Sequence, residues 1–171
     1  MSNKTNLDFD EYICQNKPDK KQRVYIWKAA IGMQNVDGLK VSEYLIETAG
    51  KSIDGDITFE EANDLINSYY RDKAACKDTE NRIEEADKVS ARIAQILSED
   101  AFVFSPDQLI AIHQRLFFSI YRFAGKIRDY NISKKEWVLK GESVIYAGSD
   151  MIRDTLNYDF DKEKHFVYSG L

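Results

Sequence analysis

The sequence predicts an all-α architecture that carries one β-hairpin, and two observations lead to this. Apolar residues recur at three- and four-residue spacing through most of the chain, which is the period of helices that bury one face. Within residues 112–147 this period gives way to two short runs of β-branched and aromatic residues joined by a Gly-bearing connection. A hairpin on a helical body is therefore expected.

The N-terminal part predicts an arm followed by a first helix. Residues 1–21 are polar, charged and interrupted by Pro18, so we expect a frayed arm there. The apolar residues of 23–36 lie near one helical face. Gly38 follows at a position where helices often end with a positive φ angle.

Two further short helices are expected after Gly38. Ser42 can cap the first of them, and Gly50 is expected to end it. Thr58 and Glu61 have the spacing of a capping box, which marks the start of the second. We therefore expect residues 22–75 to form a small three-helix unit.

Residues 76–171 are expected to form a second unit, beyond a linker of mixed charge. An apolar stripe predicts a core helix in its first part, and Ser105-Pro106-Asp107-Gln108 is a strong helix-start signal. Helical structure is expected to continue to about Phe118, and Gly125 is expected to stop it. The stripe of the core helix comprises Ile83, Ala86, Val89, Ile93, Ile96 and Leu97.

The hairpin is expected from two runs, Trp137-Val138-Leu139 and Val144-Ile145-Tyr146, which flank Lys140-Gly141-Glu142-Ser143. After it, Ser149 can cap a last helix. An exposed edge strand offers N–H and C=O groups to which an extended partner segment can add as another strand. The alternative is a hairpin that only covers the helices.

Composition excludes several classes of protein. A net charge of -5 argues against a nucleic-acid surface, which needs clustered positive charge. No apolar run approaches the ~20 residues of a membrane span, and the N-terminus lacks the apolar core of a signal peptide. We therefore expect a cytoplasmic protein that does not associate with membranes. Cys14 and Cys76 are expected to be free thiols.

The residues alone reveal no catalytic or metal-binding constellation. His113 and His165 are far apart and have no Cys or carboxylate at metal-ligand spacing. His113 lies on a mostly apolar helix face, so a hydrogen-bonded core histidine is expected in preference to a catalytic base, and His165 is expected to be solvated. None of the eight glycines belongs to a phosphate-binding loop.

Three motifs nevertheless resemble a known family. They are His-x-x-Leu-Phe at 113–117, Ile-Tyr-x-Phe-Ala-Gly-Lys-x-Arg at 120–128 and Tyr-Asn-Ile-Ser-Lys at 130–134. With the hairpin that follows, they resemble the first half of a Fic domain over roughly residues 79–171. Proteins with this domain typically transfer AMP from ATP to a hydroxyl of a target protein. The family's catalytic loop, His-Pro-Phe-x-Asp/Glu-Gly-Asn, does not occur in this sequence, so ATP and Mg²⁺ are expected to bind only the complete enzyme.

In the Fic family the hairpin is called the flap, and it registers the target so that a side-chain hydroxyl lies near the nucleotide. By position in the motif, Ser143, Val144, Ile145 and Tyr146 correspond to the second strand of the flap. The resemblance implies that a target protein docks there as an extended peptide.

A second resemblance lies in residues 33–39, which are similar to the small antitoxins that repress Fic enzymes. Their inhibitory motif, Ser/Thr-x-x-x-Glu-Gly/Asn, pairs its Glu with an Arg of the catalytic loop. Here Met33 replaces Ser/Thr, and Asp37 replaces Glu before Gly38. Asp keeps the charge but is one methylene shorter. Asp37 and Gly38 are thus the inhibitory-motif candidates, and the alternative is that residues 36–38 merely end a helix.

Two classes of function are therefore expected. One is the N-terminal portion of a Fic protein adenylyltransferase that holds a regulatory unit and the target-docking flap. The other is a non-catalytic interaction or regulatory module, a truncated or remnant Fic protein that binds a partner through the flap. They are discriminated by whether the coding sequence continues past Leu171 into His-Pro-Phe-x-x-Gly-Asn. In both, the resemblance implies that some packing partners of the apolar stripes after Thr79 lie beyond residue 171, so self-association is expected.

Overall fold

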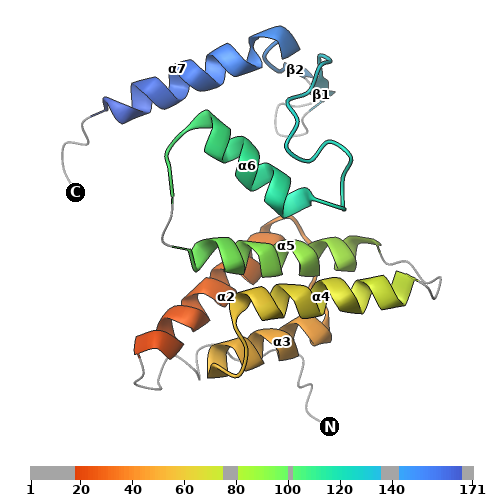
Figure 1. Ribbon diagram of the computed structural model, residues 1–171. Coiled ribbons are helices and arrows are strands. Elements are labelled where there is room, and N and C mark those ends of the chain that lie inside the picture. The colour runs from red at the N-terminus through yellow and green to blue at the C-terminus, as the bar shows by residue number, and fades with distance from the viewer. Residues whose placement is uncertain (1–17, 75–80, 100–101, 136–142, 167–171) are drawn as a thin grey trace. The chain divides into compact units, whose positions relative to one another are not determined.

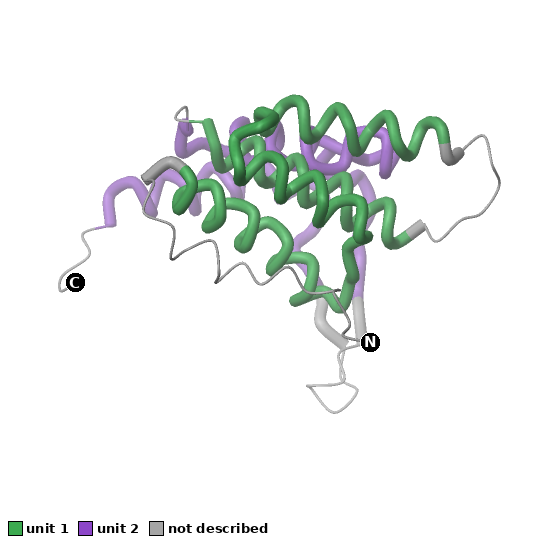
Figure 2. The backbone as a smooth tube through the Cα atoms, turned by 90° about the horizontal axis from the view of Figure 1, so that it is seen from below, with its two compact units in different colours: residues 1–101 green, residues 102–171 purple. Residues whose placement is uncertain are grey.

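The structure is a computed structural model that describes residues 18–74, 81–99, 102–135 and 143–166. These residues are mostly helical, which confirms the all-α prediction. The chain divides into two compact units, residues 1–101 and 102–171 (Figure 2). Helices α2 to α5 belong to the first unit, and helices α6 and α7 with two short strands belong to the second.

Helix α2, Pro18–Val36, is the first element of the first unit. It begins earlier than the sequence predicted, so the expectation of a frayed arm is wrong for residues 18–21. Pro18 is the first helical residue. Its missing N–H has no intrahelical partner to lose at that position, and its fixed φ suits a helix start. The rest of the expected arm, residues 1–17, lies outside the described residues.

Helix α3, Glu43–Asp54, begins as predicted, because Ser42 Oγ accepts a hydrogen bond from the Leu45 N–H at 3.1 Å. The prediction that Gly50 ends this helix is wrong, since Gly50 is buried inside it. The helix ends before Gly55, where φ is +87° and the N–H donates to carbonyls of the last turn. A left-handed glycine after the last turn is what stops the helix.

Helix α4, Phe59–Ala74, begins with the predicted capping box. The Glu61 N–H donates to Thr58 Oγ1 at 3.1 Å, and the Thr58 N–H donates to Glu61 Oε2 at 2.7 Å. Hydrogen bonds from the Thr58 N–H and then from the Thr58 side chain hold the pKa of the Glu61 carboxyl below its usual value, because they favour its charged form.

Helix α5, Asn81–Leu97, packs against α2 and α4 (Figure 1). The units therefore divide after Ala101, whereas the sequence predicted a division between residues 75 and 76. Helix α5 belongs to the first unit because its small residues share one apolar core with Trp27. The buried residues of that core are Val24, Trp27, Ala30, Ile31, Leu45, Ala49, Ile53, Ala62, Ile66, Tyr70, Ala91 and Ala94.

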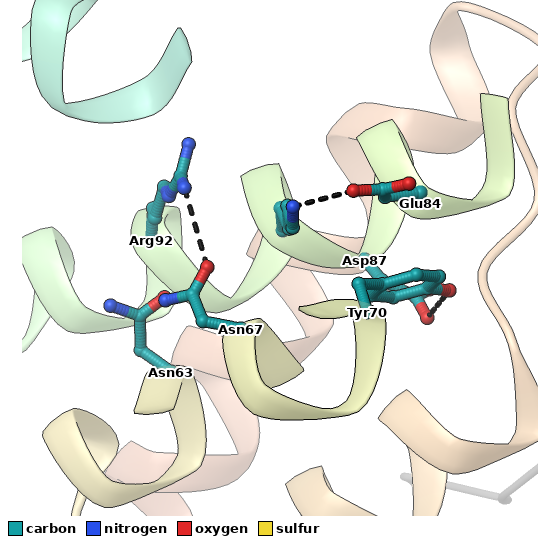
Figure 3. Close-up of polar contacts among 7 residues, drawn as sticks. Asn63, Asn67, Tyr70, Glu84, Asp87 and Arg92 are labelled. Carbon is teal, nitrogen blue, oxygen red and sulfur yellow. Dashed lines mark hydrogen bonds and ion pairs between the residues drawn. The ribbon is translucent and has the colours of Figure 1, made fainter. Parts of the chain in front are cut away.

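A buried carboxylate joins three of these helices. Asp87 of α5 is 0% exposed. Its Oδ2 accepts a hydrogen bond from the Tyr70 hydroxyl of α4 at 2.7 Å (Figure 3). Its Oδ1 accepts one from the backbone N–H of Ser42 at the start of α3, at 2.8 Å, and the Ser42 hydroxyl donates to Oδ2. These donors offset the cost of taking the carboxylate out of water.

Polar side chains on the facing sides of α4 and α5 continue the contact (Figure 3). Arg92 donates to Asn67 Oδ1 at 3.4 Å, and Asn63 donates to Gln95 Oε1 at 3.1 Å. Burial lowers the pKa of the Arg92 guanidinium. Arg92 still carries its charge at neutral pH, because the ordinary pKa of arginine is so high.

Tyr70 should make the stability of the first unit depend on alkaline pH. Burial, followed by the hydrogen bond to Asp87, raises the pKa of the Tyr70 hydroxyl. A folded-state pKa above the unfolded value gives stability that is complete below about pH 10, the unfolded value, and is lost as pH rises further. The free energy of unfolding, measured with urea from pH 8 to 11, should therefore fall more steeply with pH in the wild type than in Tyr70→Phe. Parallel pH profiles would show that Tyr70 makes no such contribution.

The second unit contains helix α6, Pro106–Phe117, and helix α7, Ile152–Lys164. Ser105 caps α6 as predicted, since its Oγ accepts a hydrogen bond from the Gln108 N–H at 3.1 Å. The two helices approach one another where the ring centroids of Phe104 and Phe160 lie 4.5 Å apart.

Two predictions for the ends of these helices are wrong. Gly125 does not stop α6, which ends at Phe117 because Phe118 has an extended backbone. Ser149 does not cap α7 with its side chain. It begins the 3₁₀ turn η2, Ser149–Met151, which leads into α7.

Residues 102–133 and 146–166 of the second unit include no buried residue. The first unit, by contrast, buries a core around Trp27. Many large apolar side chains of the second unit are exposed instead: Phe102, Val103, Phe104, Leu109, Phe118, Tyr121, Phe123, Tyr130, Ile132, Tyr146, Met151, Tyr158 and Phe166. Exposed apolar surface on this scale is typical of a surface that takes a partner.

Self-association should follow from this exposed surface. Sedimentation velocity at increasing concentration should show growing oligomers, and an apolar dye such as ANS should bind and fluoresce. Phe118→Ser, at a side chain that is 66% exposed, should reduce both signals, whereas Lys126→Ser should leave them unchanged. A monodisperse monomer that binds no dye at high concentration would contradict the prediction.

Candidate functional site

The candidate site is an antiparallel pair of short strands, β1 (Ser133–Lys135) and β2 (Ser143–Ile145). Lys134 lies opposite Val144 in the register. The residues that join the strands, 136–142, lie outside the described part, and so does the predicted first run, Trp137–Leu139.

The register determines which N–H groups of β2 point outward. The Tyr146 N–H donates to the Ile132 carbonyl at 3.4 Å. Hydrogen-bonded and non-hydrogen-bonded pairs alternate along an antiparallel ladder, so the Val144 N–H also points toward β1. The N–H groups of Ser143 and Ile145 therefore point away from β1. Within the described residues the sheet has only these two strands, so no third strand covers that edge.

The predicted docking residues are thus brought together on one strand and its end. Ser143, Val144 and Ile145 form β2, and Tyr146 follows it, 40% exposed. The sequence predicted this group as an edge but could not show which of its N–H groups face outward. That direction depends on the pairing with residues 132–135, which only the structure gives.

Sequence reasoning missed the residues at the base of the strand pair. The Arg128 guanidinium donates to the carbonyl of Tyr130 before β1 and to the carbonyl of Ala147 after β2, each at 2.5 Å. Asn131 Oδ1 accepts a hydrogen bond from the Ser149 N–H at 2.8 Å. A signal was present, because Arg128 and Asn131 stand in the motifs at 120–128 and 130–134, but the sequence does not show which groups they bind.

His113 is hydrogen-bonded, as predicted, but it is only partly buried. Its Nδ1 accepts a hydrogen bond from the Gly125 N–H at 2.8 Å, so Nδ1 carries no proton. The ring also contacts Phe117 and Phe123, with centroids 5.0 and 6.3 Å away. This arrangement ties helix α6 to the segment that leads to β1. His165 is exposed, as expected.

The inhibitory-motif candidates lie at the end of α2, in the first unit, away in sequence from the strand pair. Gly38 has φ of +70°, its N–H donates to the Asn35 carbonyl, and the Leu39 N–H donates to the Gln34 carbonyl. These two hydrogen bonds form a Schellman motif. Residues 36–38 thus end a helix, as the alternative expected, and this leaves the side chain of Asp37 exposed to solvent.

A cavity of about 440 Å³ opens in the first unit between the ends of α2, α4 and α5. Arg23 in its lining donates to the carbonyls of Ser52 and Ile57, at 2.8 and 3.5 Å. Glu60 and Glu99 also line the cavity. Two carboxylates beside a cation that is already hydrogen-bonded do not favour a phosphate site.

Within the described ranges, no group of three or more His, Cys, Asp or Glu side chains could hold a metal ion. The same part of the chain contains no helix with the length and apolar character to cross a membrane. In comparisons with known proteins, no family model, no curated protein and no solved structure matches this chain.

Proposed function

We propose that this chain is the regulatory and target-docking portion of a Fic-type protein adenylyltransferase. The observation that supports this most is the outward direction of the Ser143 and Ile145 N–H groups, at the position where the motif resemblance places the flap. An extended target segment would add to this edge through main-chain hydrogen bonds. The target would be a protein with a side-chain hydroxyl, and the proposed setting is the cytoplasm.

The first unit would supply the regulation. Asp37 is solvent-exposed at the end of α2, so its carboxylate is accessible to an arginine of a catalytic loop. Asp can pair with Arg, but its shorter side chain requires a closer approach of the two backbones than Glu does. Repression by this motif would therefore be weaker, and Asp37→Glu would strengthen it.

A screen of extended peptides tests the docking function directly. The full chain would be titrated, by fluorescence polarisation, with labelled ten-residue peptides that each carry Ser, Thr or Tyr. Saturable binding of at least one peptide, competed by its unlabelled form, is expected. Failure of every peptide in a diverse library would contradict the docking function.

This chain alone should not transfer AMP. The reaction needs a base to accept the proton of the target hydroxyl and a backbone cradle for the phosphates of ATP. The motif that provides them in the family is absent from the sequence, and ATP and Mg²⁺ would bind the complete enzyme. Incubation with labelled ATP, Mg²⁺ and cell lysate should leave no label on protein. Labelling that disappears in His113→Ala would contradict this and make His113 a catalytic base.

A second function, a non-catalytic interaction module that binds its partner through the flap, is favoured by the lack of buried residues at 102–133 and 146–166. Such a unit needs another polypeptide to cover its apolar side chains. The coding sequence after residue 171 distinguishes the two functions. A coding sequence that continues into His-Pro-Phe-x-x-Gly-Asn supports the transferase, and one that does not supports the module.

A further inference from the structure

Among the described residues the strand pair is short, so its own hydrogen bonds there give the register little support. Each strand has three described residues. An isolated two-stranded hairpin is marginal in water even when it is longer. A slip of one residue would also reverse which N–H groups face outward, and would turn the Ile145 N–H toward β1. Side chains that fix the register from outside the ladder would therefore help a docking edge on β2.

Two side chains at the base of the pair provide such a device. Arg128 lies before β1 in the sequence, and its guanidinium bridges the Tyr130 and Ala147 carbonyls, one on each side of the pair. Asn131 makes a second bridge, to the Ser149 N–H. Both bridges join the residues that enter β1 to the residues that leave β2. They therefore favour one register, that is, one set of residues of β1 and β2 that lie opposite one another.

The segment that carries Arg128 is itself anchored to helix α6. The Gly125 N–H donates to His113 Nδ1, and φ at Gly125 is +72°. A Cβ atom at Gly125 would lie 2.7 Å from Gln114 Cβ, so the backbone approaches the helix as closely as a glycine allows. The bridges thus start from a segment whose position on α6 is defined.

We propose that Arg128 and Asn131 are positioning residues that lock the register of the strand pair, so that Ile145 presents its N–H to a docked peptide. This inference rests on the proposed docking function. It predicts that removal of either bridge weakens docking without unfolding either helix of the second unit. The planar guanidinium matters, because it can reach two carbonyls at once and an ammonium has no such fork geometry.

The test compares paired variants of the full chain by amide hydrogen exchange. In the wild type, exchange at Val144 should be slower than at Ile145, because only the Val144 N–H points toward β1. Arg128→Ala and Asn131→Ala should each reduce this contrast by about tenfold, the order expected for the loss of one hydrogen bond. Asn131→Asp keeps the acceptor oxygen and should retain the contrast. Exchange in α6 should be the same in all of these variants.

A peptide taken from the screen then separates the two proposals. Arg128→Lys keeps the positive charge but should weaken peptide binding nearly as much as Arg128→Ala. If the peptide binds both variants as tightly as the wild type, the positioning role is wrong while docking stands. If no peptide binds the wild type, docking is wrong, and the exchange contrast alone decides the positioning role. An unchanged contrast in both alanine variants would overturn that role.

Discussion

Ile145→Pro should abolish the binding of an extended peptide to β2. Proline has no N–H, so it cannot donate the hydrogen bond that a docked strand would accept at the outer edge. The Ile145 N–H points away from β1, so the substitution removes no hydrogen bond from the ladder itself. Peptide titration of the variant should show no saturable binding up to the highest concentration tested.

Two matched variants serve as controls for Ile145→Pro. Ile145→Ala keeps the N–H and should have a small effect, roughly 0.2–1 kcal/mol, the range typical of side-chain changes in a strand pair. Val144→Pro removes an N–H that points toward β1, so it should disturb the strand pair itself and its amide exchange. If Ile145→Pro and Ile145→Ala weakened binding equally, main-chain docking would be wrong and the strand pair would only cover the helices.

Asp87→Ala should destabilise the first unit by about 3 kcal/mol. The substitution removes the acceptor of the buried Tyr70 hydroxyl and of the partly buried Ser42 N–H, and the loss of such an acceptor costs about 1–3 kcal/mol per buried group. Loss of the buried charge offsets part of this cost. Urea unfolding followed by Trp27 fluorescence measures the effect, with Trp137→Phe as the background so that Trp27 is the single tryptophan.

Tyr70→Phe and Glu84→Ala are the controls for this measurement. Tyr70→Phe removes one donor and leaves the Asp87 carboxylate with Ser42, so it should cost about 1–2 kcal/mol. Glu84 pairs with Lys88 at 2.5 Å but is 36% exposed, so Glu84→Ala should cost less than about 1 kcal/mol. Equal effects of Asp87→Ala and Glu84→Ala would show that the buried network does not join the three helices.

The sequence predicted the helix starts that a side chain caps, but it did not predict which glycine ends α3. The caps at Ser42, Thr58 and Ser105 depend on a side chain and an N–H within three residues, so local sequence is enough to identify them. Helix ends depend on which glycine adopts a positive φ. Gly50 and Gly55 look alike in the sequence, but Gly50 packs inside the first unit and Gly55 does not.

The division into units could not be predicted either, because it depends on which helices α5 packs against. Helix α5 has an apolar stripe that predicts burial, but a stripe does not identify the partner. Its contacts with α2 and α4 depend on Ala91 and Ala94, and on Asp87, which interrupts the apolar pattern. A buried carboxylate is costly unless donors from other segments reach it, and the sequence cannot show that they do.

For the candidate site, the sequence predicted the edge at 143–146 and the structure supplied its direction. Strand pairing depends on residues far apart in the chain. Successive N–H groups of a strand point to opposite edges, so the sequence cannot show which of them face outward until the register is known. Arg128 and Asn131 could not be assigned for the same reason, since their partners, Ala147 and Ser149, lie across the pair.

Amide exchange at Ile145, measured by NMR in the full chain with and without a bound peptide, tests the docking claim most directly. If the peptide adds to β2 as a strand, the Ile145 N–H becomes hydrogen-bonded, and its exchange should slow by at least about tenfold at saturation, as for one added hydrogen bond. Exchange at Val144, whose N–H already points toward β1, should change little. Unchanged exchange at Ile145 in the presence of a saturating peptide would contradict docking by strand addition to β2.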